Sequence, residues 1–494
     1  FNTDKKTSDI RKDYAQTHLP AMLKLSGLTE NDANKAAKVV FAIEKDLASK
    51  SRKLEDLRDP YANYNKLSLN QLHALTPAID WALVFDKMSV KKVDSVIVGQ
   101  PEFYQEVNSL LKKYSLNDWK AYLRWNVLSS FAPYLNKAVV DEDFRFRGKV
   151  ISGKKEQLPR WKKVLDAENG LMGEVLGQLF VKEYFPATAK KRYEKLVEAI
   201  RDTYRERIKA LDWMSAETKA KALSKLNKIS KKVGYPEKWK DFSSLEINRD
   251  SYVGNIIKAN KFWYAYELNK LGKPVDRTEW DMTPQTYNAY YNPSNNEIVL
   301  PAAIFTIPGM RDEQVDDAVV YGYAGASTIG HEITHGFDDE GRQFDADGNL
   351  KSWWTKADGD KFNEKAALMI KQFDEFVVLD SLHVNGKATL GENIADLGGI
   401  VLGFEAFKKT AQYKEGKKIN GLTPQQRYFL GYALGWLGAQ RNERLANQIL
   451  TDVHAPANLR VNGPFANLPE FYEAFGIKRD SPMWRSEALR VKIW

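Results

Sequence analysis

Helical periodicity is the feature that most constrains how this chain folds. In residues 27–59, apolar side chains recur every three or four positions after Thr29, a residue type that caps helix N-termini. Pro60 ends that pattern, and Ser68 and Ser215 offer the same capping chemistry to later helices. The first half of the sequence therefore predicts an almost entirely helical lobe.

The pattern of the sequence changes near residue 254, from helical periodicity alone to a mixture of β-rich runs and helices. Residues 286–305 read "TYNAYYNPSNNEIVLPAAIF", two short β-rich runs around a turn, which predicts a hairpin. A further helix is expected across residues 315–337. Because 494 residues are too many for one core, we expect two lobes, residues 1–253 and residues 254–494.

Composition excludes several classes of protein. The sequence has no cysteine, so it has neither disulfides nor thiolate metal ligands. No apolar run approaches the ~18 residues that predict a membrane-spanning helix, which favours a soluble globular chain. Lys and Arg number 74 against 65 Asp and Glu. This mild excess, without a dense basic arm, indicates a solvated surface rather than a nucleic-acid groove.

Two histidines four residues apart, in "IGHEITHGFDDEG" (residues 329–341), predict a metal site. On a helix, His331 and His335 lie on one face and can both reach one zinc ion at ~2.0–2.1 Å. Glu332 is rotated by ~100° from His331, where it can reach a water on the metal as a general base. The alternative is a pair of ordinary histidines on a helix surface.

A catalytic zinc needs a third protein ligand, which must here be His, Asp or Glu. "GENIADLGG" (residues 391–399) places Glu392 and Asp396 at i and i+4, so both carboxylates face one way. One could bind zinc while the other accepts the free ring N–H of a ligating histidine. From spacing alone, a capped helix with solvent-facing acids is an equal alternative.

Four stretches together resemble the neprilysin-like, or M13, zinc metallopeptidases. They are "NAYYNPSNNEIVLPAAIF", "GHEITHGFDDEGRQFDADGNLKSWW", "GENIADLGG" and "DVHAPANLRVNGPFANLPEFYEAF", in the family's order. In the first half "DLRDPYANYNKLSLNQL" and "LDWMSAETKAKAL" fit as well. The resemblance implies a mainly α, two-lobed fold with a small β-element in the catalytic lobe, around a closed central cavity.

The resemblance also assigns roles to individual residues. It implies one zinc ion per chain held by His331, His335 and Glu392, with Glu332 as the base. Asp396 is similar to the acid that orients a ligating histidine, and Asp338 to a second such acid. The remaining matches are His454 for transition-state stabilisation, and Asn288, Ala289, Arg460 and Trp436 for substrate binding.

These assignments predict a zinc metalloendopeptidase, similar to bacterial oligopeptidases, that cuts short peptides on the amino side of hydrophobic residues. In this hypothesis Glu332 activates a water bound to zinc, and zinc and His454 stabilise the oxyanion. One alternative is an inactive peptide-binding or scaffold relative with a structural zinc. Another is a binder of anionic polymers that uses the net charge of +9.

The sequence begins at Phe1 rather than at Met. Judged from where the shared motifs start, the family's domain begins well upstream of Phe1, so we expect a missing N-terminal family segment, as a separate piece or as further chain. The sequence leaves open whether a targeting segment belongs to that missing start. Zero cysteine alone fits either the cytoplasm or a bacterial envelope, but the resemblance to a bacterial member of the family without disulfides favours the periplasm, the cell envelope or secretion over the cytoplasm.

Overall fold

The computed structural model describes residues 5–307 and 309–494. The first four residues of the predicted N-terminal lobe, and Pro308, lie outside the described residues. The chain divides into two compact units, unit 1 (Phe1–Leu171, Asp241–Val275 and Arg441–Asn447) and unit 2 (Met172–Lys240, Asp276–Gln440 and Gln448–Trp494).

This division differs from a single boundary at residue 253. Residues 172–240 belong to unit 2 because helix α10 (Ala187–Ala210) buries its apolar face in the core of that unit. Val197 and Ile200 of α10 are fully buried in one cluster with Ile298 and Ile333. Helical spacing predicts the buried face of α10, but it does not reveal which core receives that face.

Unit 1 is built almost entirely from helices, with one two-stranded antiparallel sheet. Its core gathers apolar side chains from several of these helices, among them Leu19, Met22 and Trp125. Its elements are α1 (Lys5–Asp13), η1 (Tyr14–His18), α2 (Leu19–Leu25), α3 (Glu30–Ser49), η2 (Leu54–Arg58), β1 (Asn65–Ser68), α4 (Leu69–Leu75), α5 (Trp81–Lys87), β2 (Ser95–Val98), α6 (Pro101–Lys113), α7 (Leu116–Phe131), η3 (Ala132–Tyr134), α8 (Lys137–Asp143), η4 (Phe144–Ile151) and α12 (Tyr252–Leu268).

Two helices belong to both units. They are α9 (Arg160–Tyr184), which leaves helical geometry at Met172 where the division falls, and α19 (Asn442–Thr451). Unit 2 contains α10 and the elements that follow it in the chain. These are α11 (Ala216–Lys228), β3 (Ser230–Gly234), β4 (Tyr290–Asn292), β5 (Glu297–Pro301), η5 (Ala302–Phe305), η6 (Asp312–Gln314), α13 (Asp317–Val320), η7 (Tyr321–Gly330), α14 (His331–His335), η8 (Gly341–Gln343), α15 (Lys356–Asp374), β6 (Val377–Leu379), β7 (Leu382–His383), α16 (Leu390–Lys408), α17 (Ala411–Glu415), α18 (Pro424–Leu434), α20 (Ala457–Phe465), α21 (Pro469–Phe475) and η9 (Glu487–Leu489).

The predicted helix starts are confirmed by the caps. The Thr29 side chain accepts from Asp32 N at 3.2 Å, and Ser68 and Ser215 cap α4 and α11 in the same way. The prediction that α3 continues to Pro60 is wrong, because the helix ends at Ser49. There the Ser49 hydroxyl bonds to a backbone carbonyl, and the polar residues that follow offer no apolar stripe to bury.

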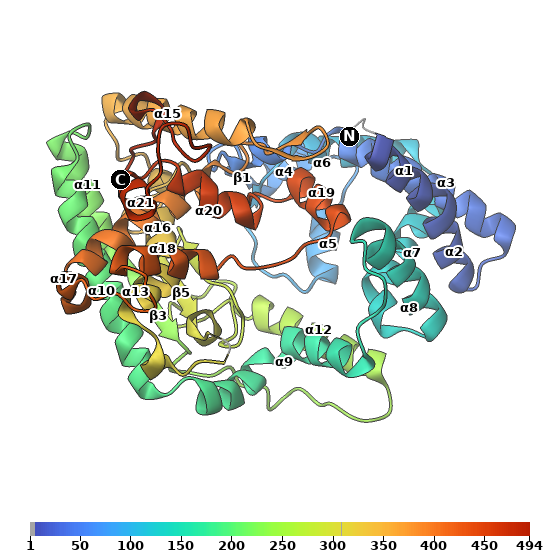
Figure 1. Ribbon diagram of the computed structural model, residues 1–494. Helices are drawn as coiled ribbons and strands as arrows, with labels where there is room; N and C mark the ends of the chain where they lie inside the picture. Colours follow the sequence, from blue (N-terminus) through green and yellow to red (C-terminus); the bar gives the residue numbers. More distant parts are fainter. Residues whose placement is uncertain (1–4, 308) are drawn as a thin grey trace. The chain divides into compact units, whose positions relative to one another are not determined.

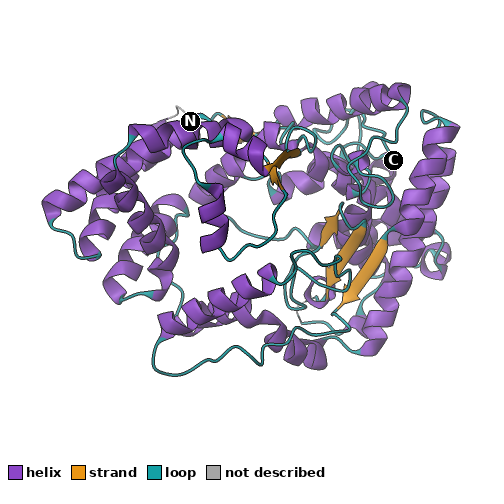
Figure 2. Cartoon of the chain, turned by 180° about the vertical axis from the view of Figure 1, so that it is seen from behind, coloured by secondary structure: helices purple, strands orange, loops and turns teal. Residues whose placement is uncertain are grey.

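The predicted hairpin is also confirmed. β4 pairs antiparallel with β5, and β3 pairs parallel with β5, giving the order β3-β5-β4. All five residues of β5 are buried, as expected for a central strand covered on both faces. Helix α10 runs beside β3, and the three strands stand out in orange in Figure 2 (Figures 1 and 2). The predicted mainly α fold with a small β-element is confirmed.

A membrane-crossing helix does not occur among the described residues, since none is both long and apolar enough.

One buried carboxylate joins two helix N-termini of unit 2. Asp358, in the first turn of α15, accepts hydrogen bonds from the Ser215 amide (3.0 Å) and from the hydroxyls of Thr218 (2.6 Å) and Thr355 (2.7 Å). Ser215 caps α11 and Thr355 caps α15. Burial raises the pKa of Asp358, but the hydroxyls of Ser215, Thr218 and Thr355 outweigh it and lower the pKa to about 2. The ionised carboxylate therefore stabilises the fold.

We expect Asp358→Asn to lower the free energy of unfolding by about 2 kcal/mol at pH 7. A depressed folded-state pKa stabilises above the ordinary carboxyl value of 3.8, and this contribution disappears as the pH falls through about 2. Roughly half of the difference between wild type and variant should be gone at pH 3. Urea denaturation of both proteins at pH 7 and pH 3 measures it.

Asp360→Asn is the matched control, because Asp360 lies on the same helix in a largely exposed pair with Lys356. Its cost should stay within about 1 kcal/mol at both pH values. A difference for Asp358→Asn that is as large at pH 3 as at pH 7 would contradict the assignment.

Candidate metal centre

The two histidines lie at the end of a long, buried helical run. The chain passes from α13 through the π-helical stretch η7 into α14 without interruption. A π-helical turn inside a helix is a costly local widening that is frequent at functional sites. His331 and His335 are one turn apart on the same face, and their ring centroids lie 4.5 Å apart at 89°. Their Nε2 atoms are separated by 3.0 Å.

Helix α16 crosses this run at very short range because both helices carry glycine at the crossing. A Cβ on Gly399 would lie 2.3 Å from the Ala326 carbonyl oxygen and 2.8 Å from His331 N. A Cβ on Gly330 would lie 2.9 Å from the Gly399 Cα. No side chain fits between the backbones, so the crossing brings the first turn of α16, with Glu392, up to the histidines.

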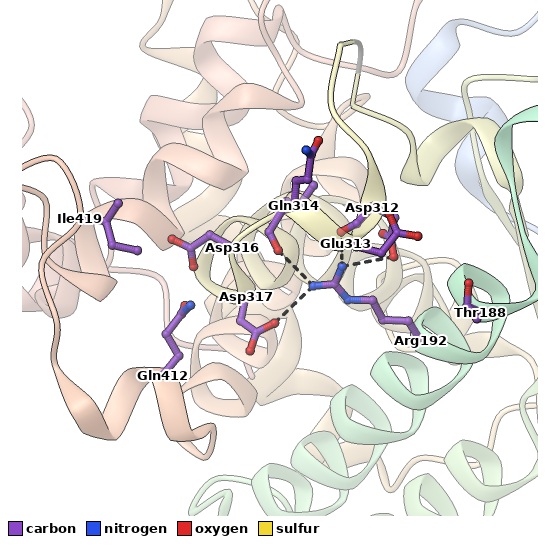
Figure 3. Close-up of a pocket in the computed structure, with 10 residues that line it drawn as sticks. Thr188, Arg192, Asp312, Glu313, Gln314, Asp316, Asp317, Gln412 and Ile419 are labelled. Atoms are coloured by element: carbon purple, nitrogen blue, oxygen red, sulfur yellow. Dashed lines mark hydrogen bonds and ion pairs between the residues drawn. The ribbon is translucent and has the colours of Figure 1, made fainter.

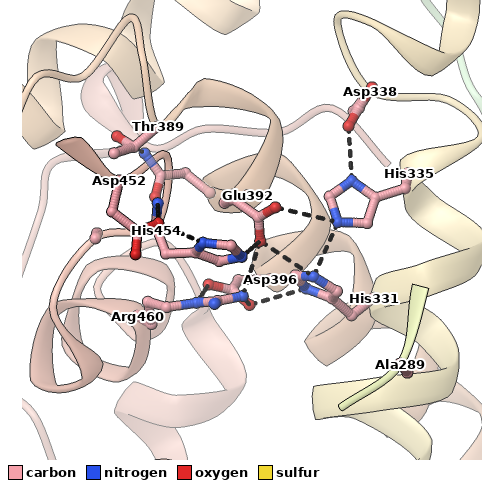
Figure 4. A network of polar contacts seen from close by, with 12 residues as sticks. Ala289, His331, His335, Asp338, Thr389, Glu392, Asp396, Asp452, His454 and Arg460 are labelled. Carbon is pink, nitrogen blue, oxygen red and sulfur yellow. Dashed lines mark hydrogen bonds and ion pairs between the residues drawn. The ribbon is translucent and has the colours of Figure 1, made fainter. Parts of the chain in front are cut away.

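Glu392 completes a cluster of three donors. Its Oε2 lies 3.3 Å from His331 Nε2 and its Oε1 lies 3.5 Å from His335 Nε2 (Figure 4). One donor atom from each of these three residues lies within 4.8 Å of the other two. Ligands about 2.0–2.1 Å from a tetrahedral ion are themselves about 3.3 Å apart, which is close to the separations found.

The outer nitrogens of both rings face carboxylates. His331 Nδ1 lies 3.0 Å from Asp396 Oδ1, and His335 Nδ1 lies 2.7 Å from Asp338 Oδ2 (Figure 4). The His335 contact is a hydrogen bond, whereas His331 Nδ1 is within ion-pair distance of Asp396 but makes no hydrogen bond to any described residue. A proton on Nδ1 leaves the lone pair of Nε2 available to a metal. Without a metal the two Nε2 atoms, 3.0 Å apart, share a proton, and a cation bound by both lone pairs would replace that proton. The donor set therefore fits a divalent cation.

The charges of the cluster fit the same conclusion. Burial lowers the pKa of His335, but the carboxylates of Glu392 and Asp338 outweigh it and raise the pKa to about 10. Burial raises the pKa of Glu392, but His335, His331 and Arg460 hold it well below its usual range. A pocket that stabilises positive charge on its imidazoles also stabilises a metal ion that replaces those protons.

Glu332 and Asp396 are both buried. Asp396 is fully buried and Glu392 is 9% exposed, so the alternative of solvent-facing acids on α16 is wrong. Glu332 follows His331 on α14 and is 6% exposed. Burial raises the pKa of Glu332. A carboxylate with a raised pKa beside a metal centre can both accept and return a proton near neutral pH.

Arg460 on α20 is held by the acids of α16. Its Nε donates to Asp396 Oδ2 at 2.8 Å, and its Nη2 donates to Asp396 Oδ1 at 2.9 Å and to Glu392 Oε2 at 3.1 Å. The guanidinium also lies over the Trp436 ring, 4.0 Å from its centroid. The expected contact between Arg460 and substrate stays a prediction, while its contacts with both acids belong to the centre itself.

His454 approaches the cluster from the segment before α20. Its Nε2 lies 3.3 Å from Glu392 Oε2, and its side chain is 45% exposed. Asp452, which sequence reasoning missed, lies 2.7 Å from His454 Nδ1 and accepts from His454 N at 2.9 Å. The signal was the short spacing "DVH", in which an acid two residues before a histidine can bond back to it.

Asn288 and Ala289 lead into β4, which is the edge strand of its sheet and lies against α14. Ala289 is labelled beside the histidine helix in Figure 4. The Asn288 side-chain oxygen accepts from Ala289 N at 2.9 Å. An edge strand has backbone groups available for pairing with an extended peptide.

A separate pocket of about 610 Å³ opens elsewhere on unit 2 (Figure 3). Its acids are compensated by Arg192, which lies 3.2 Å from Asp312 Oδ2 and 3.3 Å from Asp317 Oδ1. None of the predicted site residues is among the described residues that line it. The metal centre is therefore the better candidate for chemistry.

Comparison with known proteins agrees with this geometry. Residues 1–236 match the N-terminal model of peptidase family M13, and residues 288–491 match the second model of the same family. An endothelin-converting enzyme homolog of Locusta migratoria is 34% identical over 491 residues, which is 95% of this chain and 67% of the relative. Human neprilysin is 33% identical over 489 residues, 94% of this chain and 65% of the relative.

Solved structures of the family are similar throughout the chain. The zinc metalloprotease Zmp1 of Mycobacterium tuberculosis, in complex with an inhibitor, has a TM-score of 0.93 at 37% identity, covering 100% of this chain and 75% of that one. PEPO from Lactobacillus rhamnosis HN001 has a TM-score of 0.89 at 28% identity, covering 100% and 76%.

The class of this protein is metallopeptidase. It is defined by the cluster of metal-ligating residues on two crossing helices and by the matches to both family models. The chain belongs to peptidase family M13. It spans about two thirds of the length of the curated relatives it matches. The predicted boundary at residue 253 falls between the two family matches, which end at residue 236 and begin at residue 288.

The glycine crossing generates a prediction. Gly399→Ala places a methyl group against two backbone atoms that cannot move independently, so it should lower the free energy of unfolding by about 3 kcal/mol or more. The distance between the two helices at the crossing should also increase. Glu392 would then move away from the histidines, and this displacement should weaken metal binding. Thermal unfolding with and without Zn²⁺ measures both effects.

Gly325→Ala is the matched control on η7, because its Cβ would make only ordinary contacts, with Ile200 Cδ1 at 3.6 Å and with Leu196 Cδ1 and Tyr321 Cβ at 3.8 Å. It should behave like wild type in both measurements. Equal effects for the two substitutions would show that the close crossing is not what positions the metal centre.

Proposed function

We propose that this chain is a zinc-dependent endopeptidase that cuts short peptides on the amino side of hydrophobic residues. The observation that carries the proposal is the convergence of His331, His335 and Glu392 on one point, with the buried Glu332 next to it. Membership of peptidase family M13 supports the same reaction class. So does Zmp1, a similar protein described as a zinc metalloprotease.

Zinc is the metal that the donor set suits best. Two imidazole nitrogens and one carboxylate oxygen leave a fourth position open, which is the arrangement of catalytic zinc sites. Bound there, one zinc ion per chain would acidify a water molecule and polarise the scissile carbonyl. The residues that would hold it are His331, His335 and Glu392, and Asp396 and Asp338 would fix the tautomer of the two rings.

Glu332 has the surroundings that a general base and acid requires. Burial raises its pKa, so the carboxylate takes a proton from the attacking water more readily than an exposed glutamate does. The same carboxyl group then delivers that proton to the departing amine. Water attack on the scissile carbonyl, proton transfer to Glu332 and proton return to nitrogen together balance one hydrolysis.

His454 is suited to stabilise the oxyanion of the tetrahedral intermediate. Its Nδ1 is held by Asp452 and its Nε2 is directed to the ligand cluster. Such a donor contributes about 2.7–4 kcal/mol to the transition state.

Substrate recognition is proposed for the residues around the centre. Asn288 and Ala289 would pair with the peptide backbone at the edge of the sheet. Trp436 would form part of an aromatic wall for a hydrophobic side chain, and Arg460 would donate to a substrate carbonyl. The restriction to short peptides in a closed cavity rests on the resemblance to the family and stays a prediction.

The alternative is an inactive peptide-binding or scaffold relative with a structural zinc. A structural zinc site needs neither a buried general base nor a partly exposed histidine beside its ligands. Glu332 is buried beside the ligands and His454 is 45% exposed next to Glu392. Both features favour catalysis.

We expect Glu332→Gln to lower kcat for a quenched fluorescent peptide by roughly 10²–10⁴-fold, because glutamine cannot accept the proton. Zinc content by metal analysis should stay at that of wild type. Glu364→Gln, an exposed site on α15, is the control and should keep full activity. Near wild-type turnover by Glu332→Gln would reject the base assignment, and mass spectrometry of the products locates the cleaved bond.

His331→Ala should lose stoichiometric zinc after dialysis, because it removes one of three ligands. Wild type should retain one zinc per chain by plasma emission spectroscopy. His383→Ala is the control, since His383 lies on β7, outside the donor cluster, and its Nδ1 lies 2.9 Å from the Asp374 carbonyl oxygen. Retention of one zinc per chain by His331→Ala would show that the ligand assignment is wrong.

A further inference from the structure

A lysine is buried inside unit 2, on a helix that contributes nothing directly to the metal centre. Lys225 on α11 is 1% exposed. Its Nζ donates to the Gly341 carbonyl at 2.6 Å and to the Phe344 carbonyl at 2.7 Å. Full burial of a lysine is rare, because the ammonium loses its hydration.

Three aromatic rings and two acids compensate for that loss. The Nζ lies 5.6 Å from the Phe337 ring centroid, 5.8 Å from that of Tyr291 and 5.9 Å from that of Trp353. Burial lowers the pKa of Lys225 to about 7, and Asp338 and Asp345 act against this shift. The amine keeps at least two N–H donors in either charge state, so both carbonyl contacts persist.

The Gly341 peptide group links this lysine to the metal centre. Its carbonyl accepts from Lys225, and its N–H donates to Asp338 Oδ1 at 2.7 Å. The other oxygen of Asp338 lies 2.7 Å from His335 Nδ1. One chain of contacts therefore runs from Lys225 through a peptide group and a carboxylate to a candidate ligand.

The turn that contains Asp338 and Gly341 is packed tightly on the end of α14. A Cβ at Gly341 would lie 1.7 Å from the His335 carbonyl oxygen, so only glycine fits. The Glu340 amide also donates to Asp338 Oδ1, at 2.9 Å. The Gly341 and Glu340 amides together thus hold Oδ1 of the Asp338 carboxylate.

Other contacts already attach α11 to the segment that follows this turn. Asn296 donates to both the Lys225 carbonyl (3.1 Å) and the Ala346 carbonyl (3.0 Å), and Lys228 pairs with Asp347 at 2.6 Å. Attachment alone does not require a buried amine. What the Lys225 side chain adds is a fixed direction for the Gly341 peptide.

We propose that Lys225 is a positioning residue of the metal centre, which holds the Gly341 peptide so that Asp338 stays on His335 Nδ1. The inference rests on the proposed zinc site. Loss of the two carbonyl contacts frees the turn and allows Asp338 to leave the ring. His335 then loses part of the basicity and orientation that a ligating imidazole gains from its carboxylate.

The test is the zinc dissociation constant of Lys225→Met, measured on the full chain by competition with a chromophoric chelator. Removing a group in contact with a ligand costs 10–100-fold in metal affinity, so a group one step further out should cost roughly threefold to tenfold. Lys225→Arg keeps the donors and should recover part of the affinity. Lys228→Met removes a neighbouring lysine from the same helix and should bind zinc like wild type.

A double-mutant cycle with Asp338→Asn separates positioning from general loosening of unit 2. If Lys225 acts through Asp338, Lys225→Met should add less than twofold to the effect of Asp338→Asn. Should Lys225→Met not fold, as judged by circular dichroism, Lys225→Gln replaces it in the same cycle. Additive effects, or wild-type affinity of the folded Lys225 variant, would overturn the proposal.

Lys240→Met controls for the loss of any buried lysine, because Lys240 pairs with Glu174 at 2.7 Å and its side chain is only 12% exposed. Its zinc affinity should equal that of wild type, and an equal loss there would overturn the proposal. If wild type itself binds no zinc, the proposed function fails. If wild type binds zinc and Lys225→Met binds it equally, only the positioning role fails.

Discussion

The arrangement of this centre depends on how closely two buried helices cross. Glycine on both helices lets α16 approach to backbone contact with the end of η7 and the start of α14, and that approach sets the distance between Glu392 and the two imidazoles. Both helices are buried along nearly their whole length, so the core of unit 2 prevents them from moving apart. The rigidity that a metal site needs therefore comes from backbone packing rather than from the ligands themselves.

Part of this could be predicted from the sequence, for identifiable physical reasons. His331 and His335 at i and i+4 imply a shared helix face whatever the rest of the chain does, and the hairpin follows from local turn chemistry. The burial of Glu392 and Asp396 did not follow from spacing, because i and i+4 acids look the same on an exposed helix. Only the crossing of α16 with the histidine helix distinguishes a buried pair of acids from an exposed pair.

Other features have no local signal. The assignment of α10 to unit 2 depends on which core receives an apolar face, and the discontinuous course of the chain follows from that. The contact between Lys225 and Gly341 joins residues more than a hundred positions apart, so no motif contains both. Likewise Arg460 reaches Asp396 from a different helix, and its position reflects the packing of α20 on α16.

The two glutamates of the centre differ in a way that separates their roles. Both are buried, and burial by itself raises the pKa of each. Glu392 faces His331, His335 and Arg460, which together outweigh burial and keep it ionised, as a metal ligand must be. Glu332 lies beside the same imidazoles, yet its pKa remains raised, as a group that exchanges protons requires. Their surroundings alone thus give the two glutamates the different charge states that the proposed roles of ligand and proton carrier require, which is the pattern expected when neighbouring carboxylates have different tasks in one reaction.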